Sequence, residues 1–247
     1  FEALFSKVDG KVKKLHSKQD AQKILSTLID DIKSISEGKS KKDTVELSHK
    51  SVLDFKLSQS ITKDSKRSPG APFTTSTLQQ EWARKFGFWV KQTMMVAQKL
   101  YEGIDLGNGE RQGLITYMRT DSVNLSNEAM DGAKKMIETT FWKQYHKKRS
   151  FTTKSAGAQE AHEAIRPTDL SRTPESLKWD LDAQQLKLYA LIWKRTLASQ
   201  MQEAIVEVTT YNFSPEKAPN QTWVSKWEVI KFDGFMKLYI EGTDDEE

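Results

Sequence analysis

The spacing of hydrophobic residues along this chain changes from alternating to helical and back again. In the amino-terminal part the expected elements are a strand over residues 3–8, a turn at Asp9-Gly10, a strand through Leu15, a helix from Asp20 to about Gly38 and an extended segment over residues 45–57. Alternation and β-branched residues predict the strands, and apolar residues every three or four positions predict the helix. Asp20 has the side chain of an N-cap. This part is therefore predicted to be rich in strands.

The middle of the chain shows helical periodicity. The expected helices are one from Ser76 to Phe86 that stops at Gly87, one that ends at Gly103, one capped by Ser126 and a long one from about Asp182 to Met201. Ser76 with Gln79 matches a capping box. Two helices joined by a short glycine turn are typical of helix-turn-helix modules, although many such hairpins never bind DNA. A polar loop is expected over residues 104–112.

The last part returns to strands. They are expected over residues 205–213, 222–230 and 235–240, with an Asp233-Gly234 turn before the last and a disordered acidic tail over residues 244–247. This order predicts an α+β fold. Residues 1–66 and 203–247 would form one strand-rich domain, and residues 67–202 a mostly helical domain inserted into it. Pro69, Gly70 and Pro72 mark the first boundary, and residues 68–70 are a candidate hinge.

Composition narrows the function only moderately. The 247 residues include 37% hydrophobic ones, carry a formal charge of +4 and contain no cysteine. Disulfides and thiolate zinc sites are thereby excluded, and four scattered histidines lack metal-ligand spacing. No apolar run approaches the roughly 20 residues that cross a bilayer, and no secretion signal is seen, so a cytoplasmic protein is expected. Because the chain begins with Phe1, we interpret it as a piece of a longer one.

The positive charge favours a polyanionic partner. Three basic runs are candidate phosphate contacts, although such runs are usually solvated turns: Lys11, Lys13 and Lys14; Lys39, Lys41 and Lys42; and Lys147, Lys148 and Arg149.

The segment GLITYMRTDS, residues 113–122, carries the most specific chemistry. Tyr117 is a candidate nucleophile, but a phenol with a pKa of about 10 attacks a phosphodiester only with help. Arg119 could supply it, because a guanidinium holds phosphate oxygens and stays charged. A tyrosine beside Ile115 and Met118 is more often core packing, and an arginine two positions on is more often solvated.

Two further segments weigh against that plain interpretation. PGAPFTTSTLQQ at residues 69–80 precedes the tyrosine segment, and EAHEAIRPTD at residues 160–169 follows it. The second cannot be an HExxH zinc site, because it lacks the second histidine. In this order, and with NLS at residues 124–126, the three segments resemble the signatures of type IA DNA topoisomerases, the bacterial topoisomerase I branch in particular. The resemblance covers nearly the whole chain.

The resemblance implies roles for individual residues. Tyr117 would attack a DNA strand, with Arg119 beside it, and His162 would contact the scissile or an adjacent phosphate. The remaining residues implied in DNA binding are Arg166, Thr116, Thr120 and Asp121. The last three would orient the loop, with Asp121 able to pair with Arg119. The implied fold is a strand-built arch that carries a winged-helix-like domain of the catabolite-activator type.

The resemblance also implies partners. The family's complete site adds a Toprim domain whose acidic residues hold Mg²⁺, and no such acidic run is present here, so no metal is expected to bind to this chain. The expected substrates are single-stranded and negatively supercoiled DNA, and the expected partners are the enzyme's remaining domains. The chain is expected to be monomeric, nucleoid-associated and inactive by itself.

Two alternatives of other classes remain open. In the first, the chain is a single-stranded DNA-binding module without catalysis, and Tyr117 only stacks on a base. In the second, it is a structural interaction domain in which Tyr117 belongs to the core. Only the DNA-binding interpretations predict an affinity for single strands that weakens steeply with salt.

Overall fold

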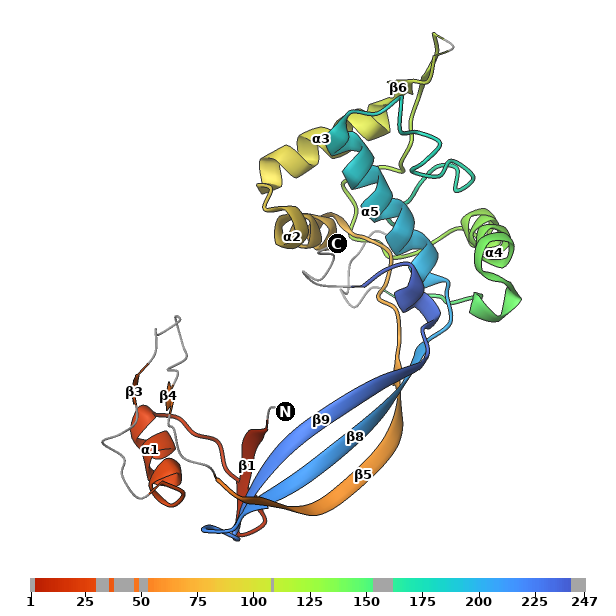
Figure 1. Ribbon diagram of the computed structural model, residues 1–247. Helices are drawn as coiled ribbons and strands as arrows, with labels where there is room; N and C mark the ends of the chain where they lie inside the picture. The colour runs from red at the N-terminus through yellow and green to blue at the C-terminus, as the bar shows by residue number, and fades with distance from the viewer. Residues whose placement is uncertain are drawn as a thin grey trace. The chain divides into compact units, whose positions relative to one another are not determined.

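The computed structural model describes residues 3–29, 36–37, 47–48, 53–107, 109–152 and 162–240. The chain divides into two compact units, the first of residues 1–65 and 206–230 and the second of residues 66–205 and 231–247. The described residues contain five α-helices and a large sheet that takes strands from both ends of the chain (Figure 1). The α+β class predicted from the sequence is therefore confirmed.

The large sheet has five strands in the order β2-β1-β9-β8-β5. Their bounds are β1 Leu4–Val8, β2 Lys11–Val12, β5 Phe55–Arg67, β8 Ala204–Pro215 and β9 Gln221–Phe232. Asp9 and Gly10 turn β1 into β2 with positive φ angles, as tight hairpins require. The long strands β5, β8 and β9 run side by side in all three views (Figure 1).

The first unit has a small core of its own. Leu28, Ile29 and Ala218 are buried together, with Trp223 packed against them. The Trp223 ring meets Phe5 and Phe55 edge to face, at centroid distances of 5.6 and 5.9 Å. Such pairs stabilise a sheet face beyond simple burial.

Helix α1 spans Lys18–Ser26, so it begins and ends earlier than predicted. Its N-cap is Ser17, whose Oγ accepts the backbone N–H of Asp20. Asp20 was wrong as the cap; its carboxylate instead accepts the backbone N–H of His16. The short strands β3 Ser36–Glu37 and β4 Leu47–Ser48 pair with each other. The predicted helix is also too long, because residues 27–29 are not helical and Ser36–Glu37 form β3. Residues 30–35 and 38, most of residues 45–52, the basic run at 39–42 and the acidic tail lie outside the described residues.

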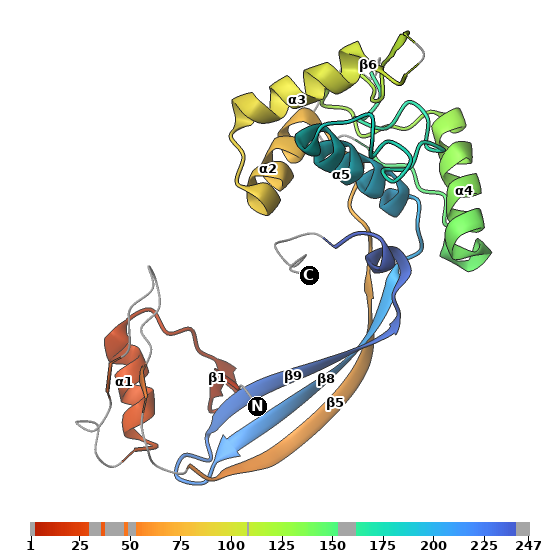
Figure 2. The ribbon, with the colours of Figure 1, turned by 45° about the horizontal axis from the view of Figure 1, so that its top comes forward.

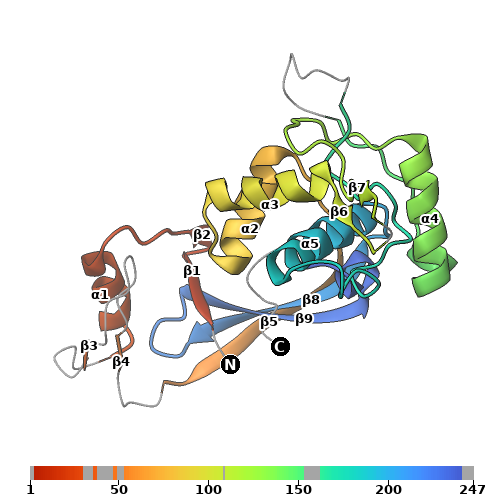
Figure 3. The ribbon, with the colours of Figure 1, turned by 90° about the horizontal axis from the view of Figure 1, so that it is seen from above.

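The second unit is built around four helices: α2 Thr75–Phe86, α3 Val90–Glu102, α4 Asn127–Phe141 and α5 Ala183–Ser199. Helix α5 contacts α3 and α4, and α2 contacts α3. Figures 2 and 3 show α5 between the α2–α3 pair and α4. The stripe predicted on α5 is core, because Tyr189, Trp193 and Leu197 are buried.

The helix ends follow local rules, with one correction. Thr74 rather than Ser76 caps α2, and it forms the capping box with Thr77. Thr74 and Thr77 have the same spacing as Ser76 and Gln79, so the sequence left the register open. Gly87 ends α2 in a left-handed conformation and Ser126 caps α4, both as predicted. Asp182 caps α5, which begins where the sequence predicted a helix to start.

The strand predicted over residues 235–240 is wrong. Gly234–Lys237 form a 3₁₀-helix, η3, and the chain after it is irregular. Phe235 and Tyr239 are both buried in the core of the second unit, and their spacing of four suits a helical turn rather than alternation. The loop predicted over residues 104–112 also contains a small hairpin, formed by β6 Ile104–Asp105 and β7 Arg111–Gln112.

Candidate active site

The segment that carries Tyr117 alternates between buried and exposed residues. Met118, Thr120 and Ser122 are buried, whereas Tyr117, Arg119 and Asp121 are exposed. Tyr117 is 40% exposed. The backbone bends at Thr116, Met118 and Arg119, so packing against the core, and not a regular strand, decides which side chains reach solvent. Packing of Met118 into the core therefore sets the outward direction of its neighbours.

The first turn of α2 holds one part of this segment. The backbone N–H of Thr75 donates to the carbonyl of Thr120 at 2.9 Å. The Thr75 hydroxyl donates to the carbonyl of Met118 at 2.8 Å and accepts the Thr120 N–H at 2.9 Å. Thr120 is itself buried, and its hydroxyl accepts the N–H of Ser122. Its observed contacts are thus internal ones that orient the segment.

Residues 164–168 hold the other part. Thr116 donates its N–H to the carbonyl of Arg166 at 2.9 Å and its hydroxyl to the carbonyl of Ala164 at 2.7 Å. The N–H of Arg166 returns to the Thr116 hydroxyl at 3.0 Å. One residue further on, Ile115 and Pro167 form a β-bridge. Tyr117 therefore lies between two anchored neighbours.

Two aromatic rings stand next to the Tyr117 ring. Tyr101, at the end of α3, meets it edge to face with 5.4 Å between centroids. The His162 ring lies 6.0 Å from it, also between centroids. Tyr101 and His162 are both exposed. The structure thus brings together Tyr117 and His162, which are far apart in sequence.

Arg119 and Asp121 are exposed on the same segment, but among the described residues no ion pair joins them. The pairing that the sequence suggested is not formed.

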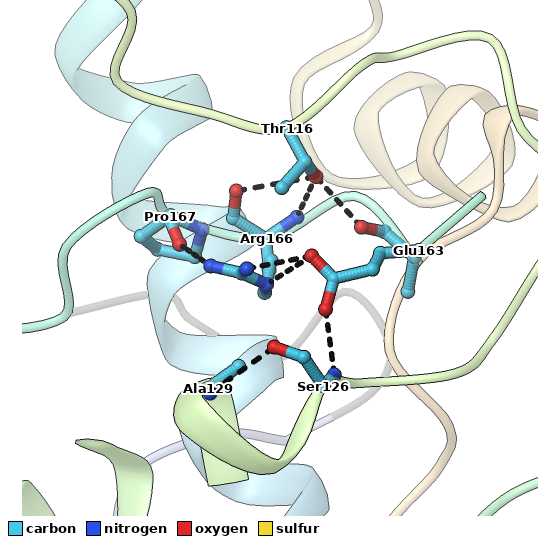
Figure 4. Close-up of polar contacts among 7 residues, drawn as sticks. Thr116, Ser126, Ala129, Glu163, Arg166 and Pro167 are labelled. Carbon is cyan, nitrogen blue, oxygen red and sulfur yellow. Dashed lines mark hydrogen bonds and ion pairs between the residues drawn. The ribbon is translucent and has the colours of Figure 1, made fainter. Parts of the chain in front are cut away.

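Arg166 is placed differently from Arg119. Its side chain is only 14% exposed, and its Nε and Nη2 donate to Oε2 of Glu163 at 3.0 and 2.6 Å (Figure 4). Its Nη1 donates to the carbonyl of Pro167 at 2.8 Å. The second carboxylate oxygen of Glu163 accepts the backbone N–H of Ser126, the N-cap of α4, at 2.6 Å.

Glu163 is a residue that sequence reasoning missed. A cluster of polar residues such as that over residues 159–169 is typical of a solvated helix face, but residues 162–169 are irregular, and Ala164 and Ile165 are buried. Burial alone would favour neutral Glu163, yet the hydrogen bonds from Ser126 and Arg166 outweigh it and lower the pKa of Glu163. The available signal was the Glu-x-x-Arg spacing beside His162.

Among the basic runs, the one at residues 147–149 has a structural role. Lys147 and Arg149 both pair with Glu203, at 2.7 and 2.8 Å. Within the described ranges, no three or more acidic or histidine side chains cluster as metal ligands would. Every helix in those ranges is also too short or too polar to span a bilayer.

Comparisons with known proteins identify the family of this chain. The sequence model of the DNA topoisomerase family matches residues 4–247. DNA topoisomerase 1 of Rickettsia prowazekii (strain Madrid E) is 47% identical over 211 residues, which are 83% of this chain and 27% of that protein. DNA topoisomerase 1 of Rickettsia conorii (strain ATCC VR-613 / Malish 7) is 50% identical over 182 residues, which are 72% of this chain and 23% of that protein.

A solved structure of a topoisomerase I is also similar to this chain. Full-length topoisomerase I from Thermotoga maritima superimposes with a TM-score of 0.69 and 32% identity, over 96% of this chain and 34% of that one. The chain thus spans about a quarter to a third of the relatives it matches. The match over nearly every residue, together with the fold, shows that this chain belongs to the bacterial type IA DNA topoisomerases.

Proposed function

We propose that this chain is the tyrosine-bearing portion of a topoisomerase that breaks and rejoins one DNA strand and thereby relaxes negative supercoils. The observation that carries the proposal is Tyr117, which is exposed while the residues on both sides of it are hydrogen-bonded to the scaffold. A nucleophile needs this combination of access and fixed position. Single-stranded and negatively supercoiled DNA are the proposed substrates.

The proposed reaction is a transesterification. The Tyr117 oxygen attacks a backbone phosphorus, the bond to the 3′ oxygen breaks, and a 5′-phosphotyrosine forms. The proton lost by the phenol is balanced by the one gained by the leaving 3′ hydroxyl. One phosphodiester replaces another, so the 3′ hydroxyl can reverse the step without ATP.

The neighbouring residues have proposed parts in this reaction. Arg119 and protonated His162 neutralise the phosphate, where negative charge accumulates in the transition state. Thr116 and Thr120 orient the segment through their internal hydrogen bonds. Asp121 completes the exposed polar face. The role of Arg166 is taken up below.

The residues around Tyr117 do not fit a magnesium site. Mg²⁺ prefers carboxylate oxygens, and beside Asp121 the groups here are the cationic Arg119 and the imidazole of His162. We therefore place the metal in a Toprim domain outside this sequence and assign this chain no step that depends on it. The chain alone is expected not to cleave DNA.

The architecture supports a winged-helix type of domain over residues 67–202. Helices α2 and α3 are joined through Gly87, and the small β6–β7 hairpin follows α3 where a wing would stand. The sequence predicted an arch of residues 1–66 and 203–247, but residues 231–247 belong to the second unit. We therefore propose a strand-built arch of residues 1–65 and 206–230, with the hinge near residues 68–70. We further propose a monomer that works in the cytoplasm at the nucleoid.

The test mixes this chain with a separately expressed Toprim-containing piece, Mg²⁺ and a 3′-labelled single-stranded oligonucleotide, and stops the reaction with denaturant. A labelled covalent adduct is expected and should be absent with Tyr117→Phe. Tyr101→Phe is the matched control, because that ring is equally exposed and touches Tyr117. An adduct that survives Tyr117→Phe, or magnesium-dependent cleavage by this chain alone, would contradict the proposal.

One observation favours a second candidate, a non-catalytic single-stranded DNA-binding module. The exposed rings of Tyr101, Tyr117 and His162 form a cluster on which bases could stack. In that case the chain binds oligonucleotides, the affinity falls when Tyr101 or Tyr117 becomes alanine, and no adduct forms with the Toprim piece.

A further inference from the structure

We propose that Glu163 and Arg166 form a positioning clamp, which holds His162 beside Tyr117, and that Arg166 acts through this clamp and not by binding a DNA phosphate. The catalytic part of this proposal rests on the proposed function. The placement of the two rings does not.

Most of the side-chain N–H donors of Arg166 already have hydrogen-bond partners within the protein. Three of its five N–H groups bond within the protein, two to one oxygen of Glu163 and one to the carbonyl of Pro167. With the side chain 14% exposed, little of the guanidinium is open to a phosphate. The Glu163 carboxylate also balances the charge of Arg166 locally, so the exposed Arg119 is the better candidate for a phosphate contact.

The backbone of Arg166 is tied to the residue before the nucleophile. Its N–H and carbonyl bond to the hydroxyl and N–H of Thr116, and Thr116 also bonds Ala164. Holding the Arg166 side chain in place therefore also holds the backbone that bonds to Thr116, the residue before Tyr117.

Glu163 links Arg166, and through it Thr116, to a third segment, the start of α4. One oxygen bonds Arg166 and the other the Ser126 N–H, where α4 begins and a negative charge is favoured. His162 precedes Glu163 in the chain, so a fixed Glu163 limits where its imidazole can lie. The Glu163 carboxylate thus joins α4 to Arg166, and the backbone of Arg166 continues the link to Thr116 in the tyrosine segment (Figure 4).

The test is a double-mutant cycle of Glu163→Gln, Arg166→Gln and the double variant. Glu128→Gln is the control, since it removes the same charge from the exposed first turn of α4. The readouts are the nuclear Overhauser contact between the His162 and Tyr117 rings, the affinity for a single-stranded oligonucleotide, and the rate of adduct formation at saturating DNA with the Toprim piece. Thermal unfolding shows which variants fold.

The clamp predicts that Glu163→Gln weakens the ring contact and slows adduct formation by about tenfold or more, since a misplacement of about 1 Å can cost on the order of a hundredfold. The affinity of Glu163→Gln for the oligonucleotide should stay the same or rise, because Arg166 loses its counterion. Arg166→Gln should slow the reaction with affinity changed by less than about twofold. The double variant should be faster than Glu163→Gln, because no unpaired charge remains.

Two results would overturn the proposal. One is a loss of affinity in Arg166→Gln with a shallower salt dependence, which would make Arg166 a phosphate ligand. The other is a ring contact that stays unchanged in Glu163→Gln. If Glu163→Gln does not fold, Arg166→Lys replaces it: this variant keeps the charge but loses the fork, so the clamp predicts a slower reaction at preserved affinity. If the unaltered chain forms no adduct, the proposed function fails, and the ring contact alone decides the clamp.

Discussion

The carbonyl oxygen of Tyr101 lies 2.6 Å from the point where a Cβ on Gly113 would stand. Next to this contact, the N–H of Leu114 donates to the carbonyl of Leu100 at 2.8 Å. The end of α3 and the start of the tyrosine segment therefore touch backbone to backbone. This approach leaves no room for a side chain at residue 113, and it also places the Tyr101 ring against Tyr117.

Gly113→Ala should therefore destabilise the chain by about 1–3 kcal/mol, as overpacking against rigid backbone does. The matched control is Gly132→Ala within α4, where a Cβ would meet only Leu170 at 3.8 Å. There alanine should stabilise by about 0.5–1 kcal/mol, because glycine is a poor helix former. Urea unfolding measures both. Equal effects of the two substitutions would show that residues 101 and 113 are not in close contact.

Thr74→Ala should lower the free energy of unfolding by about 1 kcal/mol, because Thr74 caps α2. Ser76→Ala, in the first turn of the same helix, should cost less. Thermal unfolding of the two variants tests the observed cap directly against the one predicted from the sequence, and a larger loss with Ser76→Ala would restore the latter.

The ion pairs of Glu203 should appear in the pH dependence of stability. Hydrogen bonds from Lys147 and Arg149 lower the pKa of Glu203 to about 2, whereas in the unfolded chain it is about 4.3. The charged form is thus favoured by folding. The stabilisation is complete above about pH 5 and is lost as the pH falls through 4.3 toward 2.

The free energies of unfolding of the unaltered chain and of Glu203→Gln should therefore differ most near neutral pH, and this difference should shrink as the pH falls from about 5 toward 2. Denaturant titrations at several pH values measure this difference. Glu128→Gln, which changes an exposed carboxylate, should show no comparable convergence. A difference for Glu203→Gln that does not depend on pH would rule out the ion pairs as its cause.

Arg119→Gln should weaken binding of a single-stranded oligonucleotide and reduce the slope of log affinity against log salt by about 0.7, the value for one phosphate contact on a single strand. Fluorescence anisotropy at a series of salt concentrations measures the slope. Lys143→Gln, the same loss of charge in the 3₁₀-helix after α4 (η2, Lys143–Tyr145), is the control. An unchanged slope in Arg119→Gln would mean that this guanidinium contacts no phosphate.

The sequence by itself determined the elements whose causes are local. The apolar stripe of α5, the Ser126 cap of α4 and the left-handed Gly87 all depend on residues within a few positions of one another, so periodicity and capping rules found them. Local rules failed where two registers fitted equally well, as with Thr74 and Ser76. They also failed at Phe235, because its burial in the core of the second unit, and not an alternating pattern, sets its conformation.

The tyrosine and its motif could be recognised in the sequence, but only the tertiary structure decided what surrounds it. Arg119 and Arg166 are both arginines close to a motif residue, and apart from the Glu-x-x-Arg spacing nothing local separates the exposed one from the one bound to Glu163. The bonds that hold Tyr117 in place join Thr116 to residues about fifty positions away. Such contacts form only when the core brings the segments together, because hydrogen bonds between distant residues follow packing and not sequence spacing.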